Sequence, residues 1–176
     1  IVLSLVGLSS QAAHPRVHVI GRKRGADVLR AVSPEHPDDE TLPGLLIVRP
    51  EGRLFFVNAQ YVTDQIEALV KQHTPRVLAL DMSRVFDLEY SALQSLMEYE
   101  KRATERGVIV WLVGLNPGVL EVARHAGLDE RLGRERMLFN ARAAIERYQA
   151  LPAAAGDAPP SCRSDVLRSG TSSSER

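Results

Sequence analysis

Short apolar runs separated by turn residues occupy the first third of the chain. Runs rich in β-branched and other apolar side chains lie at residues 17–20, 45–48 and 54–57. The stretch Pro50-Glu51-Gly52 supplies turn chemistry between the second and third runs. We therefore expect three strands here, with the last two joined as a hairpin.

From residue 58 onward the apolar period changes to that of helices alternating with buried strands. Asn58 is the predicted N-cap of a first helix, whose apolar positions recur at helical spacing up to Pro75. A continuous apolar run at residues 77–80 ends at Asp81 and predicts a strand buried on both faces of a sheet. A second helix is predicted from about Glu89 to Arg106.

The same alternation continues through the second half of the chain. The most apolar run, residues 108–113, predicts an inner strand in which Trp111 is largely buried. Two further helices are expected at residues 116–127 and 141–151, with a short apolar stretch at 137–139 between them. The pattern predicts an α/β fold: a mixed, mainly parallel β-sheet with about four helices packed on it.

Two segments lack this regular pattern. The connection at residues 21–44 contains three prolines and an acidic cluster, and its length predicts a functional or mobile loop. Beyond Pro152 the chain is rich in Pro, Ser, Ala and Gly without an apolar period. We therefore expect one domain over residues 14–150, followed by a disordered tail over residues 151–176.

The chain begins with an apolar stretch, Ile1 to Leu8, that is shorter than the roughly 20 residues a membrane-spanning helix needs. The sequence leaves open whether residues 1–13 are the end of a membrane helix, a signal-peptide remnant or a core strand. Basic residues that follow a membrane segment mark its cytoplasmic side. The basic residues that follow here are equally well explained by a solvated loop. They are Arg16, Arg22, Lys23, Arg24 and Arg30.

Composition narrows the classes of function. The chain has 176 residues, of which 44% are hydrophobic and 25% charged, enough for one core. Its formal net charge is zero, so we do not expect a nucleic-acid partner. A single cysteine, Cys162, provides neither a disulfide nor a cysteine metal site within the chain, which favours a reducing compartment.

Signatures of several enzyme classes are absent from the sequence. It contains no phosphate-loop pattern, dinucleotide glycine fingerprint, HExxH or GxSxG, and its five histidines lack metal-ligand spacing. Asp87 and Glu89 are candidates for paired acid–base carboxylates, but their position at a predicted helix start favours a capping role. We expect no catalytic residue, no metal and no cofactor.

The segment from Asp81 to Leu93 resembles the signature of the STAS domain, a family named for sulfate transporters and anti-sigma-factor antagonists. In the antagonists, an Asp-Ser-Ser-Gly sequence at this helix start carries the phosphorylated serine, and it corresponds here to Glu89-Tyr90-Ser91-Ala92. The resemblance implies that Ser91 is a candidate phosphorylation or regulatory site. It also implies an interaction loop, with candidate residues Asp81, Ser83, Asp87, Glu89 and Tyr90.

Four further segments, at residues 16–22, 43–49, 54–58 and 112–117, are similar in order and spacing to the C-terminal domain of bacterial SulP transporters. This resemblance implies a regulatory and assembly domain at the cytoplasmic face of the bacterial inner membrane, with residues 1–13 ending a membrane helix. The implied partners are the transmembrane domain of the same chain, a second protomer and an unknown cytosolic protein. The implied transported ion is sulfate, bicarbonate or a dicarboxylate.

Two alternative functions remain open on the sequence. One is a free-standing anti-sigma-factor antagonist switched by phosphorylation of Ser91. The other is a small nucleotide-binding or nucleotide-hydrolysing enzyme that depends on Asp81 or Ser83, because parallel sheets often bind ligands beyond the carboxyl ends of their strands.

Overall fold

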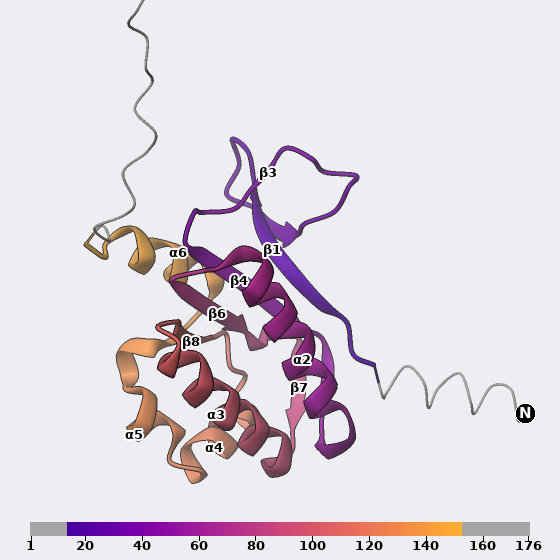
Figure 1. The fold of residues 1–176 in the computed structure, drawn as a ribbon, viewed down its shortest axis with the longest axis vertical. Coiled ribbons are helices and arrows are strands. Elements are labelled where there is room, and N and C mark those ends of the chain that lie inside the picture. The colour runs from indigo at the N-terminus through magenta and orange to yellow at the C-terminus, as the bar shows by residue number, and fades with distance from the viewer. Residues whose placement is uncertain (1–13, 153–176) are drawn as a thin grey trace, which may run out of the picture.

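Parallel strands form the centre of the main sheet in the computed structural model, which describes residues 14–152 (Figure 1). The strand order is β2-β1-β4-β6-β8-β9, with β3 also paired to β1. Neighbours from β4 to β9 pair in parallel, whereas β1 is antiparallel to β4. The strands are β1 Val17–Lys23, β2 Leu29–Ala31, β3 Asp39–Glu40, β4 Leu45–Pro50, β6 Val77–Asp81, β8 Ile109–Val113 and β9 Met137–Leu138.

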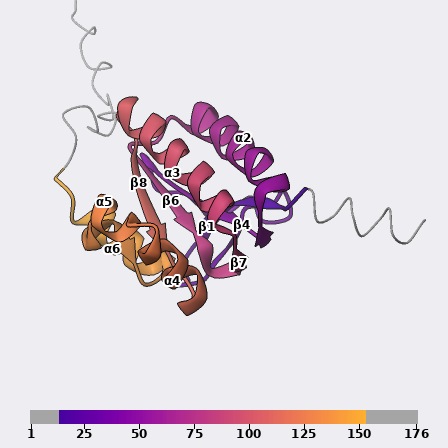
Figure 2. The same ribbon diagram turned by 90° about the horizontal axis from the view of Figure 1, so that it is seen from below.

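Helices cover both faces of this sheet. Figure 2 shows α2 and α3 together on one face and α6 on the other. The larger core lies under α2 to α5, and the smaller core lies under α6. The predicted mainly parallel α/β fold is confirmed, and its helices are α2 Phe56–His73, α3 Tyr90–Glu105, α4 Pro117–His125, α5 Leu128–Leu132 and α6 Ala141–Gln149.

Strand β6 alternates between the two cores. Leu78 and Leu80 belong to the larger core, whereas Val77 and Ala79 belong to the smaller one, and all four are at most 1% exposed. This is the two-period of a strand whose two faces are both covered. On the next strand Trp111 is 3% exposed, so its predicted burial is confirmed.

The predicted hairpin between residues 45–48 and 54–57 is wrong. Both edges of β4 are occupied, by β1 on one side and by β6 on the other. The chain instead leaves the main sheet after β4, and β5 (Gly52–Leu54) pairs in parallel with β7 (Val85–Leu88). Between the two sheets the chain passes through Glu51 and Gly52, which has φ 104°, and enters a second, two-stranded sheet.

The first helix begins at Phe56, before the predicted N-cap Asn58. Asn58 occupies the third helical position, where its side-chain oxygen accepts a hydrogen bond from the Phe55 N–H at 3.0 Å. Its amide nitrogen donates to the Arg53 carbonyl at 2.9 Å. Asn58 therefore stabilises the helix start from inside the first turn, as the second residue of a capping box does.

The long connection at residues 21–44 is folded onto the sheet through β2 and β3. Arg30 donates two hydrogen bonds of 2.8 Å to Asp39, whose side chain is almost fully buried. The guanidinium of Arg30 holds the pKa of the Asp39 carboxyl below its ordinary value. This ion pair joins the two short strands and gives the connection a defined path.

Helix α6 joins the end of the domain to the start of β4. The Tyr148 hydroxyl donates to the Pro43 carbonyl at 2.9 Å, and a Cβ at Gly44 would collide with the same hydroxyl. Leu151 also packs against the smaller core, so the folded part includes this first residue of the predicted tail. Residues 1–13 and 153–176, which hold the proposed membrane-helix end and most of the tail, lie outside the described residues.

In the part of the chain that the structure describes, every helix is too short or too polar to cross a bilayer.

Tyr99 of α3 is a buried tyrosine between α2 and α3. It is 1% exposed, and its hydroxyl has no hydrogen-bond partner among the described residues. Burial, with a smaller contribution from the Glu67 charge, raises the pKa of Tyr99 from 10.0 to about 12. Because the folded state holds this proton more tightly than the unfolded state, Tyr99 does not change the stability at pH values well below 10, and its titration lowers the stability as pH rises from 10 towards 12.

We expect Tyr99→Phe to be as stable as the parent at neutral pH, or slightly more stable, because it removes a buried unpartnered hydroxyl. Urea unfolding followed from neutral to alkaline pH should show a smaller loss of stability for this variant. Tyr90→Phe, which changes an exposed tyrosine on the same helix, is the matched control. Equal alkaline losses in both variants would contradict the assignment to Tyr99.

Candidate functional site

Asp81 lies at the carboxyl end of β6 and pairs with Arg49 at the end of β4. The register of β4 and β6 aligns Ile47 with Ala79. Two residues further along each strand, Arg49 and Asp81 therefore lie opposite each other and project from the same face of the sheet. Arg49 donates from Nε at 2.9 Å and from Nη2 at 2.7 Å to Oδ2 of Asp81. The side chain of Asp81 is 2% exposed and that of Arg49 17%, so the pair is largely buried.

The second carboxylate oxygen of Asp81 fixes the backbone that follows. Its Oδ1 accepts a hydrogen bond from the Ser83 N–H at 3.0 Å and so starts the short 3-10 helix η1 (Met82–Arg84). Gly114 passes close by at φ 64°, and a Cβ there would lie 3.2 Å from Oδ1. Asp81 is thus a buried organiser of the loop, whereas Ser83 is exposed.

The next part of the loop is held by Arg53 of β5. The parallel register places Arg53 opposite Asp87, and Arg53 forms ion pairs of 2.8 Å with both Asp87 and Glu89. Glu89 occupies the N-cap position of α3, but its side chain makes no capping hydrogen bond within the described residues. Glu89 therefore lies at the helix start as predicted but does not cap it through its side chain, whereas Asp87 lies in β7. A cation from a distant strand binds both carboxylates.

Four exposed apolar residues lie in the same elements as this ion-pair cluster or directly after them. Phe56 and Tyr90 begin the neighbouring helices α2 and α3, which follow the paired strands β5 and β7. They are 76% and 59% exposed, and Val57 and Phe86 are 65% and 72% exposed. We call these four residues, with Arg53, Asp87 and Glu89, the outer surface. Ser91 lies in the first turn of α3 and is half-buried.

The structure places all six candidate residues in one connection but divides them between two surfaces. Asp81 and Ser83 line a cleft of about 490 Å³ on the α6 side of the sheet. Asp87, Glu89 and Tyr90 belong to the outer surface, with Ser91 in the adjoining helical turn. Sequence reasoning missed Arg53, and its only local signal was a lone arginine before an apolar run.

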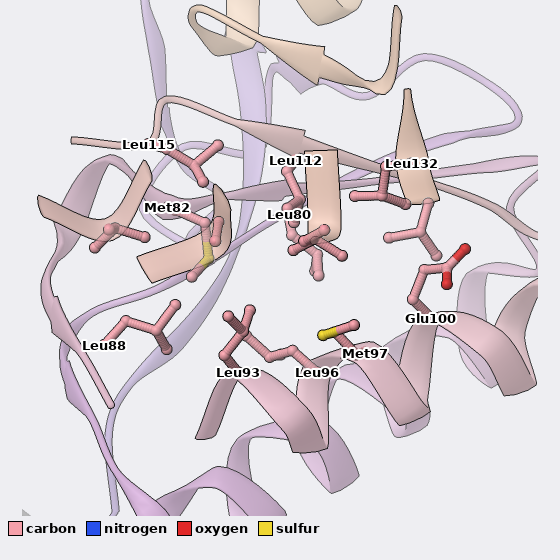
Figure 3. Close-up of a pocket in the computed structure, with 14 residues that line it drawn as sticks. Leu80, Met82, Leu88, Leu93, Leu96, Met97, Glu100, Leu112, Leu115 and Leu132 are labelled. Carbon is pink, nitrogen blue, oxygen red and sulfur yellow. The ribbon is translucent and has the colours of Figure 1, made fainter. Parts of the chain in front are cut away.

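A second hollow lies inside the larger core, below the first turns of α3. Figure 3 shows leucine side chains from the sheet, Leu80 and Leu112, facing Leu93, Leu96 and Met97 of α3. The cavity has a volume of about 20 Å³, room for about one water molecule, and its lining is apolar except for Glu100. It is a small packing defect rather than a ligand pocket.

Glu100 beside this cavity is a buried carboxylate that is paired with an arginine. It accepts hydrogen bonds from the Thr104 hydroxyl at 3.0 Å and from Arg131 of α5 at 2.9 Å. Arg136 is a more distant partner at 3.8 Å. These contacts tie α3 to α5 and account for the carboxylate structurally. Within residues 14–152, no group of three or more potential metal-ligating side chains gathers in one place.

The family to which this arrangement belongs follows from comparison with known proteins. The sequence model of the STAS domain family matches residues 36–144, more than half of the chain. This region contains the whole connection from Asp81 to Ser91. The chain belongs to the STAS domain family. The STAS fold inferred from the loop signature is thereby confirmed.

Curated relatives of this STAS domain are sulfate transporters. High affinity sulfate transporter 2 of Stylosanthes hamata is 26% identical over 158 residues, which cover 84% of this chain and 24% of the transporter. The chain thus spans about a quarter of the length of this relative. The similarity extends to both sides of the region matched by the family model.

Solved structures share the fold at lower identity. The murine Slc26a9 anion transporter in its inward-facing state superposes with a TM-score of 0.74 at 21% identity, over 86% of this chain and 25% of the transporter chain. The SulP transporter STAS domain from Vibrio cholerae superposes with a TM-score of 0.53 at 23% identity, over 66% of this chain and 93% of that one. A putative anti-sigma factor antagonist from Thermotoga maritima superposes with a TM-score of 0.54 at 20% identity, over 62% of this chain and 92% of that one. None of these proteins is named as an enzyme.

Proposed function

We propose that this STAS domain is the cytosolic C-terminal regulatory and assembly domain of a bacterial SulP-type secondary anion transporter. The observation that carries the proposal is the match to sulfate transporters over 84% of the chain but only 24% of their length. This is the relation expected of one domain within a larger membrane protein. The transported anion would be sulfate, bicarbonate or a dicarboxylate.

In this proposal the domain lies at the cytoplasmic face of the inner membrane and has no catalytic activity. Residues 1–13 end the last membrane helix, residues 14–150 form the STAS domain and residues 151–176 form a tail. The transmembrane domain of the same chain and a second protomer are its partners, together with a cytosolic protein. The coding sequence upstream of Ile1 offers a direct test, because a gene without multiple membrane spans before Ile1 would overturn the proposal.

Of the two surfaces of the loop, the outer surface suits a protein partner. Its exposed aromatic residues, Phe56, Phe86 and Tyr90, provide apolar contact area, and the ion pairs around Arg53 form a polar rim. Exposed apolar clusters of this kind mark interaction sites. The similarity to sulfate transporters favours a transporter domain over a free-standing antagonist.

Ser91 gives this surface a site for regulation by phosphorylation. The first N–H groups of α3 have no partner within the helix, and the helix dipole favours negative charge there. A phosphate adds roughly −1.5 to −2 charges beside Asp87 and Glu89, whose carboxylates repel it. It therefore alters the docking of a partner more readily than it unfolds the domain.

We expect Ser91→Glu in the full transporter to reduce anion uptake while the protein stays folded. Uptake into cells or proteoliposomes measures the first effect, and thermal unfolding of the 176-residue chain measures the second. Gln94→Glu adds the same charge about one turn further along α3 and is the matched control. Unchanged uptake in Ser91→Glu would leave Ser91 with a structural role only.

A further inference from the structure

The cleft on the α6 side of the sheet is built by five parts of the chain. Its walls come from the ends of β4, β6 and β8, from the turn before β2 and from the start of α6. Its volume is about 490 Å³, enough for a small ligand with several waters. The carboxyl edge of a parallel sheet is where strand ends leave such a crevice.

Arg49 places a guanidinium group in the wall of the cleft, and only some of its hydrogen-bond donors are engaged. Its Nε and Nη2 both bind Oδ2 of Asp81, which holds the guanidinium plane in place. Within residues 14–152, Nη1 of Arg49 makes no hydrogen bond. A guanidinium anchored on one edge presents its other edge to a ligand without losing further side-chain entropy.

Arg142 provides a second cation at the mouth of the cleft, where it is held by a replaceable partner. Its Nη2 lies 2.7 Å from Oδ2 of Asp27, and the two side chains are 56% and 65% exposed. Exposed ion pairs of this kind are weak and exchange readily with other charged groups. An anion that enters the cleft therefore competes with Asp27 for Arg142.

Residues with neutral hydrogen-bond donors line the cleft together with the two arginines. Asn140 caps α6 by accepting from the Ala143 N–H at 2.8 Å, so the N–H groups of Ala141 and Arg142 are not used inside the helix. Ser83, an exposed residue that carries a hydroxyl, lines the same space. A cleft lined by charged and neutral donors suits a compact ligand whose oxygens share a negative charge.

We propose that this cleft binds a small oxyanion, such as sulfate, phosphate, bicarbonate or a short carboxylate, between Arg49 and Arg142. The anion displaces the Asp27 carboxylate from Arg142, so occupancy of the cleft weakens the hold of α6 on the turn before β2, which keeps the hydrogen bond of 3.4 Å from Arg142 Nη2 to the Asp27 carbonyl. The cleft is formed by this domain alone. A test on the isolated chain therefore stands or fails independently of the transporter assignment.

The test is a titration of the 15N-labelled 176-residue chain with sodium sulfate, phosphate, bicarbonate or succinate, monitored at the backbone amides of Gly114, Asn140 and Ala141. Sodium chloride at equal ionic strength controls for screening. We expect saturable shifts at these amides with one or more of the oxyanions. The anion that binds most tightly identifies the ligand among them.

Two substitutions at the mouth should change the affinity in opposite directions. Asp27→Asn removes the competing carboxylate and should tighten binding by about two- to five-fold, the strength of an exposed ion pair. Arg142→Gln should weaken binding by about tenfold or more, because it removes a charged hydrogen-bond donor. Both side chains are more than half exposed, so neither change should lower the melting temperature appreciably.

Arg124→Gln, on the exposed side of α4, is the control for loss of one positive charge. Four results would each overturn the proposal. These are no saturable shift with any of the four anions, equal shifts with chloride, binding that Arg142→Gln leaves unchanged, and weakening in Arg124→Gln equal to that in Arg142→Gln.

Discussion

Replacing Asp81 with Ala should lower the free energy of unfolding by about 3 kcal/mol, because it leaves a largely buried arginine without its counter-ion. The loss should lie at the lower end of the range for broken buried ion pairs, since the side chain of Arg49 is 17% exposed. The variant also loses the hydrogen bond that starts the 3-10 helix at Ser83. Urea unfolding followed by circular dichroism measures the change.

Two further variants separate the ion pair from the rest of the loop. Asp38→Ala removes an exposed carboxylate and should change stability by less than about 0.5 kcal/mol. In the double variant Asp81→Ala with Arg49→Met, the unpaired charge is removed as well, so part of the lost stability should return. Strictly additive losses would show that Arg49 and Asp81 are not coupled.

Replacing Leu96 with Ala should cost about 2 to 5 kcal/mol, the usual range for a buried leucine. Leu96 is 7% exposed and lies against the apolar cavity between α3 and the sheet (Figure 3). Because a cavity of about 20 Å³ is already present there, the removed side chain enlarges an existing void. Both thermal unfolding and urea unfolding should rank Leu96→Ala as less stable than the parent protein.

Glu98→Ala is the matched control for this helix, since Glu98 is exposed on α3 two residues after Leu96. It should change stability by less than about 0.5 kcal/mol. A near-neutral effect of Leu96→Ala would mean that α3 does not pack on the sheet through this face.

The sequence was informative wherever one short segment carried the whole signal. The runs at residues 77–80 and 108–113 predicted the inner strands β6 and β8, because strands covered on both faces have no polar alternation. The starts of α4 and α6 were visible from Asn116 with its following proline and from the residues around Ala141. The short helix α5, five residues between two glycines, was missed, since its length is below a clear helical period.

The candidate site was harder to predict because its contacts join distant segments. Arg49 and Asp81 are 32 residues apart, and their pairing depends on the register of two parallel strands. The Arg53 ion pairs depend on β5 leaving the main sheet to meet β7, which no local pattern indicated. The STAS resemblance located the loop in the sequence, but only the fold divided it between a cleft and an outer surface.

The position of α6 also determines when the domain is able to fold during synthesis. By residue 140 the ribosome has made every strand of the sheet, yet the helix that covers Ile47, Ala79 and Trp111 has not been translated. Until Tyr148 reaches Pro43, 105 residues earlier, the nascent chain exposes one apolar face of its sheet. A newly made chain therefore needs protection from aggregation until its last described helix emerges, and one that terminates before α6 never loses that need.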